Sequence, residues 1–133
     1  MMSVAEEFFI SLKNGDYLKT WNLLSEKSKE RILKDILDRA KGKEPIDFSK
    51  LRQDFDSCGT LCRIYWDTFV KGFNPDLAIY ESSWEIGRIK KKEGEIILRY
   101  KEAKRPAILK MYKEDGSWKV GLVESFWPRK GSR

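Results

Sequence analysis

Residues 107–127 read AILKMYKEDGSWKVGLVESFW, and this stretch decides the fold. Asp115-Gly116 at its centre is typical of a tight turn, because glycine adopts a positive φ without a Cβ clash. Apolar and polar residues alternate on both sides of that turn, which predicts an antiparallel hairpin with one buried side. We therefore expect Trp118 to face a covering layer and Lys119 to point away from it. A lone hairpin is marginal in water, so other parts of the chain must supply the cover.

A second hairpin is expected just before this one. From Ser83 onward apolar residues again alternate with polar ones, Gly87 indicates a β-bulge, and residues 92–94 (Lys-Glu-Gly) indicate the turn. The side chains that we expect to face inward from the four strands are Trp84, Ile86, Ile89, Ile96, Leu98, Tyr100, Leu109, Met111, Trp118, Val120 and Leu122.

Helical periodicity dominates the first 80 residues. Ser3 is expected to open the first helix in a capping box, and Gly15 to end it. Asp16 and Ser25 are expected to cap the next two helices. A long apolar stripe then runs from residue 51 to 73, but Gly59-Thr60 interrupts it with two poor helix formers. We expect a kink there, or two helices with Ser57 capping the second.

Together these patterns predict an α+β fold in a single domain. A chain of 133 residues can bury roughly two thirds of its unfolded surface. We expect residues 1–80 to be mainly helical, with a short loop at 41–45, residues 83–127 to form mainly antiparallel sheet, and residues 128–133 to be a frayed tail. The helices should pack on one face of a sheet of four strands or slightly more.

Two stretches resemble the NTF2-like (cystatin-like, SnoaL-type) superfamily. Residues 5–28, AEEFFISLKNGDYLKTWNLLSEKS, look like its opening helix, Gly-Asp turn and second helix. Residues 113–122, KEDGSWKVGL, look like its closing hairpin. The resemblance implies a strongly curved sheet wrapped around helices into a cone, often with an internal pocket and often dimeric through the outer sheet face. Family members include isomerases, dehydratases, hydrolases and transport factors, so the fold alone implies no activity.

Composition narrows the class of protein without naming an activity. Charged residues make up 36% of the chain, histidine is absent, and lysine, glutamate and isoleucine are plentiful, as in heat-adapted cytosolic proteins. The first residues are too charged for a signal peptide, and no stretch reaches the ~20 apolar residues of a membrane span. We expect a cytoplasmic protein that does not enter a membrane and that needs no cofactor.

The hypothesis that the protein is an enzyme depends on Glu124. Without histidine, which is the commonest base near neutral pH, a buried carboxylate is the best remaining candidate. If the last strand continues past Leu122, Glu124 faces inward and could act as the base, with Tyr65 or Tyr100 as the hydrogen-bond donor. If the strand bulges or ends there, Glu124 lies in water.

Five aromatic residues are candidates for lining a ligand pocket, because aromatic rings give a large apolar wall with polar handles. They are Tyr65, Trp66, Phe69, Trp84 and Tyr100. The alternative is that the same rings close the core and leave no cavity.

Cys58 and Cys62 are expected to be buried structural thiols. On a continuous helix, residues four apart have Cβ atoms roughly 5–6 Å apart, whereas a disulfide prefers about 3.8 Å. Two cysteines are too few for a disulfide scaffold, and a zinc site would need two further ligands with no histidine present. A break of the helix at Gly59 would weaken this interpretation.

The positive charge is concentrated in the last third of the chain. Residues 84–133 hold 14 basic and 7 acidic side chains, whereas the net charge of the whole chain is +6. The basic side chains expected on the outer sheet face are Arg88, Lys90, Arg99, Lys101, Lys110 and Lys119. Such a face could bind nucleic acid, form the rim of a homodimer interface, or remain solvated.

The sequence thus favours a non-enzymatic domain that binds a small apolar ligand or a protein partner. Acid–base catalysis by Glu124 is the first alternative, and nucleic-acid binding by the outer face is the second.

Overall fold

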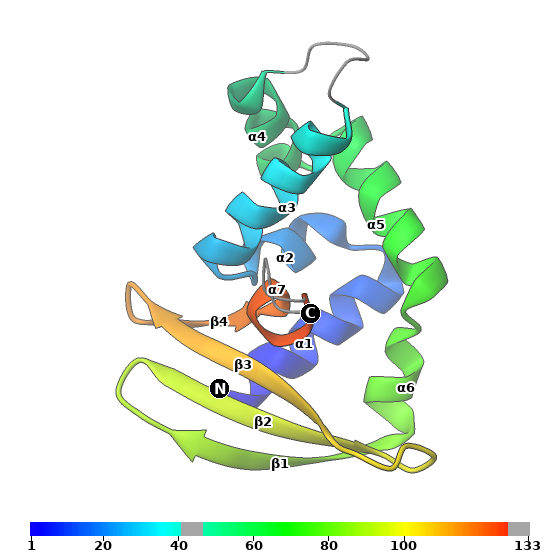
Figure 1. Cartoon of the computed structure of the whole chain (residues 1–133), viewed down its shortest axis with the longest axis vertical. Coiled ribbons are helices and arrows are strands. Elements are labelled where there is room, and N and C mark those ends of the chain that lie inside the picture. The colour runs from blue at the N-terminus through cyan, green and yellow to red at the C-terminus, as the bar shows by residue number, and fades with distance from the viewer. Residues whose placement is uncertain (41–46, 128–133) are drawn as a thin grey trace.

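The computed structural model describes residues 1–40 and 47–127, in which helices come first and a sheet follows (Figure 1). The loop expected at 41–45 and the tail expected at 128–133 lie outside these residues. The helices are α1 (Met2–Asn14), α2 (Tyr17–Asn22), α3 (Glu26–Arg39), α4 (Phe48–Ser57), α5 (Thr60–Gly72), α6 (Pro75–Tyr80) and α7 (Leu122–Phe126). The strands are β1 (Ser82–Ile89), β2 (Glu93–Tyr100), β3 (Ala107–Glu114) and β4 (Ser117–Gly121).

The four strands form one antiparallel sheet in the order β1-β2-β3-β4, which confirms the α+β prediction. The sheet lies at one end of the molecule, and α3, α4 and α5 extend away from it (Figure 1). It is open and not strongly curled, so it does not close into a cone. No helix within the described ranges is long and apolar enough to cross a membrane.

The final hairpin forms as its turn residues predict. Asp115 and Gly116 both have positive φ, 50° and 81°, which suits the twist of a two-residue hairpin turn. Trp118 is half-buried and packs against the core, whereas Lys119 lies on the other side and donates a hydrogen bond from Nζ to the carbonyl of Asn22 (2.8 Å). The prediction is confirmed for Trp118, whereas Lys119 was expected to point away from the helices and instead bonds the backbone of α2.

The inner face of the sheet packs on the helices over most of its area. Its fully or nearly fully buried side chains include Ile96, Leu98, Leu109, Met111 and Val120, and the helices contribute Phe8, Phe9, Trp21, Leu33, Phe55 and Trp66. Ile86 and Ile89 lie on the side that was predicted, but they are 51% and 58% exposed. Both are on the inner side of β1, but none of the described helices packs over them.

Local capping explains where several helices begin and end. Gly15 ends α1 in the left-handed conformation, and the side chains of Asp16 and Ser25 accept from the backbone amides of Lys19 and Ser28, as predicted. The capping box at Ser3 does not form, because α1 already begins at Met2 and its N-cap residue is Met1. The chain therefore places Ser3 within the helix, where its hydroxyl has no capping role.

The long apolar stripe breaks into α4 and α5, and the cap differs from the one expected. Cys58 adopts a left-handed conformation (φ 49°), and α5 begins at Thr60. The carboxylate of Asp54 accepts from the backbone amides of Leu61 (3.2 Å) and Cys62 (2.8 Å). Asp54 therefore caps α5, the role that was expected of Ser57. The break thus depends on an acidic side chain from the preceding helix.

The break also corrects the prediction of free thiols. Cys58 and Cys62 form a disulfide, with their Cα atoms 5.0 Å apart. The estimate from a continuous helix fails because Cys58 lies after the end of α4 and Cys62 lies inside α5.

The last strand ends earlier than predicted. Gly121 is its last residue, and the chain turns there into α7. Leu122 is buried as expected, but from a helix rather than from a strand. Residues 122–126 therefore do not follow strand alternation, which changes the position of Glu124.

Candidate functional site

An apolar groove lies between α1, α6 and β1. It has a volume of about 320 Å³ and is lined by Met2, Glu6, Ile10, Ile79 and Trp84. Ile10 is 43% exposed, although α1 buries most of its other apolar side chains. This volume is at the lower end of the range for small-molecule sites, and the apolar lining is typical of them.

Trp84 forms a fixed wall of this groove. Its Nε1 donates to the carbonyl of Ala78 in α6 (2.7 Å), and its ring meets Phe9 edge to face with centroids 5.7 Å apart. Because the indole N–H is already used, Trp84 offers a ligand only its ring face. The one ionisable lining residue is Glu6, which is exposed, whereas the adjacent Glu7 pairs with Lys19 (3.8 Å).

The five aromatic residues predicted to line a pocket lie in different surroundings. Edge-to-face contacts join Tyr65 to Trp66 and Trp66 to Phe69, with centroids 5.0 and 5.3 Å apart. Trp66 is fully buried, so its ring fills the core. Tyr100 lies at the end of β2 and donates from its hydroxyl to Glu102 (3.4 Å). Of the five, only Trp84 lines the apolar groove.

Glu124 lies on α7, where two serines hold its carboxylate. The hydroxyl of Ser25 donates to Oε2 (2.8 Å), and the hydroxyl of Ser28 donates to Oε1 (2.6 Å). Ser28 also accepts from the backbone amide of Val123 (3.0 Å), so it ties the start of α3 to α7. The strand ends before Glu124, so strand alternation does not set the position of this side chain. Its role as a base stays a prediction.

The tyrosine beside Glu124 is Tyr112, which the sequence reasoning missed. The two lie on the wall of an open cleft of about 520 Å³ between α3, α7 and β3. Burial raises the pKa of Tyr112, and the negative charges of Glu124 and Glu93 raise it further. Alternation with the buried Met111 places Tyr112 on the outer side of β3, and nothing local in the sequence indicates that α7 folds back beside it.

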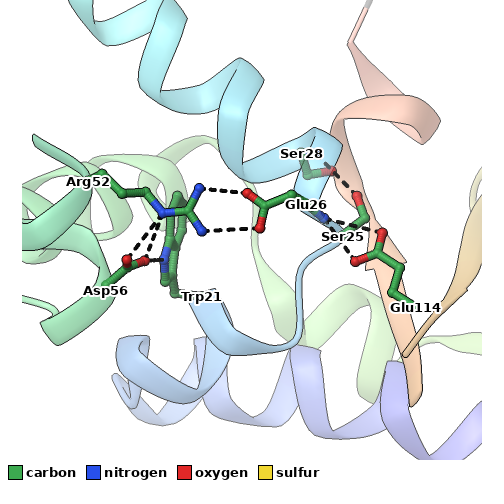
Figure 2. A network of polar contacts seen from close by, with 7 residues as sticks. All are labelled: Trp21, Ser25, Glu26, Ser28, Arg52, Asp56 and Glu114. Carbon is green, nitrogen blue, oxygen red and sulfur yellow. Dashed lines mark hydrogen bonds and ion pairs between the residues drawn. The ribbon is translucent and has the colours of Figure 1, made fainter. Parts of the chain in front are cut away.

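A second polar network fixes α3 against α2 and α4 (Figure 2). Trp21 donates from Nε1 to Asp56 (2.9 Å), and Arg52 bonds both Asp56 (3.1 Å) and Glu26 (2.6 Å). The backbone amide of Glu26 in turn donates to Glu114 of β3 (3.1 Å). Side chains from four elements thus meet around the start of α3, which gives this network a structural role.

Acid will weaken this network. Hydrogen bonds from Arg52 are the main reason that the pKa of Glu26 lies below its ordinary value of 4.5. Burial alone would raise the pKa of Asp56, but the bonds from Trp21 and Arg52 lower it overall. Each carboxylate therefore contributes stability above its unfolded-state pKa and loses it as the pH falls through the lowered value.

This acid dependence can be measured by urea unfolding at pH 6 and pH 3. Arg52→Gln should lose less stability between these two pH values than the unaltered chain does, because the two lowered pKa values depend on Arg52. An equal loss in both proteins would contradict this account of the network.

The outer basic face is mixed in sign rather than uniformly basic. Arg99 pairs with Glu85 (2.8 Å), and Lys101 pairs with Glu81 (3.0 Å). Lys119 bonds the backbone of α2, as described above. The remaining three, Arg88, Lys90 and Lys110, line a shallow hollow of about 170 Å³ together with Glu93, Glu95 and Tyr112. Acidic side chains are therefore interleaved with the basic ones.

Metal ligands do not cluster in the described residues: 1–40 and 47–127 contain no group of three or more His, Cys, Asp or Glu side chains suited to one ion. No protein family, no curated protein and no solved structure matches the chain.

Proposed function

We propose that this chain is a non-enzymatic, NTF2-like binding domain whose groove between α1, α6 and β1 takes a small apolar ligand with a cationic group. The observation that carries the proposal is the groove's lining, which combines four apolar side chains with the single carboxylate of Glu6. The order of a helical half followed by an antiparallel sheet supports the NTF2-like assignment.

The chemistry of the lining defines the ligand. Met2, Ile10, Ile79 and the face of Trp84 gain about 25 cal/mol for each Å² of apolar surface that a ligand covers. Glu6 favours a positive charge at the rim, and a cation over the face of Trp84 would gain further. An apolar side chain of a partner protein next to a lysine or arginine would offer the same chemistry.

A matched pair of amphiphiles tests this proposal. Decylammonium and decanoate have the same chain length and opposite charge, and both can be titrated below their micelle concentrations by calorimetry. We expect decylammonium to bind with a dissociation constant of roughly 0.1–1 mM, which corresponds to about 0.4–0.5 kcal/mol per heavy atom. Decanoate should bind at least fivefold more weakly, because Glu6 repels its carboxylate.

Two variants and a control locate the binding. Glu6→Gln should remove most of the difference between the two amphiphiles, and Ile10→Gln should weaken both. Leu18→Gln is the control, because Leu18 is similarly exposed (41%) but lies on α2. The proposal fails if neither amphiphile binds, or if Ile10→Gln and Leu18→Gln have the same effect.

The two other hypotheses from the sequence stay predictions. Glu124 and Tyr112 share one cleft, but both serine contacts to Glu124 have the geometry of a structural clamp. Nucleic-acid binding by the outer face is not favoured by the acidic residues interleaved there.

A further inference from the structure

The open edge of β1 carries the two most exposed isoleucines of the sheet. In the described part of the chain β1 pairs with β2 alone, so its other edge has free backbone donors and acceptors. Ile86 and Ile89 are 51% and 58% exposed beside this edge. An exposed strand edge with apolar side chains is a template for pairing with another strand. We call residues 85–90, which end with the residue directly after β1, the β1 edge segment.

A bulge decides which side each residue of this segment occupies. Ile86 lies opposite the buried Ile96, and Ile89 lies opposite Gly94, with a register shift between them. A side chain on Gly94 would meet Met1 and Trp118, so Gly94 is on the inner side, and Ile89 shares that side with Ile86.

Charged residues of the segment occupy the opposite side. Glu85 lies opposite Ile97, and a side chain on Gly87 would meet Glu95 and Ile97. Arg88 and Lys90 line the outer hollow together with Glu95. The segment therefore presents isoleucines on one side, and a glutamate followed by two basic residues on the other.

We propose that two copies of this chain pair through their β1 edges, antiparallel and around a two-fold axis that passes between Gly87 and Arg88. Opposite residues of antiparallel strands point to the same side. In this register Ile86 lies opposite Ile89 of the second copy, so four isoleucines meet on the inner side. On the outer side Glu85 lies opposite Lys90 of the second copy, and the two-fold axis produces this pair twice.

Other registers of the two β1 strands bring together side chains that are less complementary. A shift that sets Glu85 opposite Arg88 of the second copy also sets Ile86 opposite Gly87, and these two residues point to different sides. A parallel arrangement would place like charges side by side. At the centre of the proposed register, Gly87 leaves space for the long side chain of Arg88 from the second copy.

This proposal is independent of the ligand groove. The groove is formed by α1, α6 and Trp84, whereas the dimer uses residues 85–90. It also differs from a dimer through the outer sheet face, because the strands of the two copies would continue one sheet. Charged residues and bulges can also prevent an edge strand from pairing. The oligomeric state in solution distinguishes a strand that pairs from a strand that is protected.

A charge exchange tests the pairing by sedimentation equilibrium of the full chain. We expect the unaltered chain to dimerise at micromolar concentration. Glu85→Lys and Lys90→Glu should each weaken the dimer at least tenfold, because each sets two pairs of like charges opposite one another. The double variant should restore the dimer. An equimolar mixture of the two single variants should form heterodimers, since every charge then meets its opposite.

Arg99→Gln is the matched control, because it removes the salt bridge between Arg99 and Glu85 within one chain and leaves the proposed contact between Glu85 and Lys90 of the second copy unchanged. It should leave the dimer intact or tighten it. A chain that stays monomeric at 200 µM overturns the proposal. The proposal is also overturned if both charge reversals leave the dimer affinity unchanged and Ile97→Lys on the outer face dissociates the dimer. Neither outcome affects amphiphile binding by the groove.

Discussion

Trp21→Ala will lower the free energy of unfolding by about 3–5 kcal/mol, the usual range for truncating a buried aromatic side chain. The ring of Trp21 is fully buried, and its centroid is 4.8 Å from that of Phe55. Its indole also donates to Asp56, which is bonded to Arg52 in turn. Alanine would therefore leave a cavity between α2 and α4 and remove one hydrogen bond to a charged group.

Trp21→Phe separates these two losses. It retains most of the apolar volume but removes the donor to Asp56, so we expect a loss of about 1.5–3 kcal/mol, as for other hydrogen bonds to charged groups. Leu18→Ala on the same helix is the control and should cost less than about 1 kcal/mol, because Leu18 is largely exposed. Urea unfolding measures all three. A loss below about 1 kcal/mol for Trp21→Ala would contradict the observed packing of α2.

Ser28→Ala will lower the free energy of unfolding by about 1–3 kcal/mol, although it removes a single oxygen. Ser28 is fully buried, and its hydroxyl both donates to Glu124 and accepts from the amide of Val123. Without that hydroxyl, a buried amide has no acceptor and a partly buried carboxylate keeps only the bond from Ser25. Buried polar groups left without partners cost about this much.

A double-mutant cycle with Glu124→Ala checks the contact itself. If the hydroxyl of Ser28 and the carboxylate of Glu124 act as one unit, the double variant should lose less stability than the two single losses combined, by about 0.5–3 kcal/mol. Ser57→Ala is a suitable control, since Ser57 is exposed and bonds only the carbonyls of its own helix. Additive losses would show that α7 is held to α3 by other contacts.

Local chemistry explains which elements could be predicted from the sequence. The turn at Asp115-Gly116 requires positive φ at both residues, and the caps at Asp16 and Ser25 act on amides three residues away. The bulge at Gly87 follows from a change of alternation within one strand. Each of these features depends on residues that are close together in the chain.

Long-range contacts explain what the sequence did not predict. Leu122 fits the alternation of a strand, but Ser28, more than 90 residues earlier, accepts from the amide of Val123 and donates to Glu124, and these two bonds favour a helical turn after Leu122. Asp54 caps α5 from the preceding helix, where the sequence pointed to Ser57.

The most direct test of the account is to locate the bound amphiphile by NMR. With ¹³C-labelled isoleucine methyl groups and decylammonium, we expect intermolecular nuclear Overhauser contacts from the alkyl chain to Ile10, to Ile79 and to the ring protons of Trp84. Contacts instead to residues of the cleft around Tyr112 and Trp127, or binding without contacts at Ile10 and Ile79, would contradict the claim that the groove between α1, α6 and β1 is the binding site.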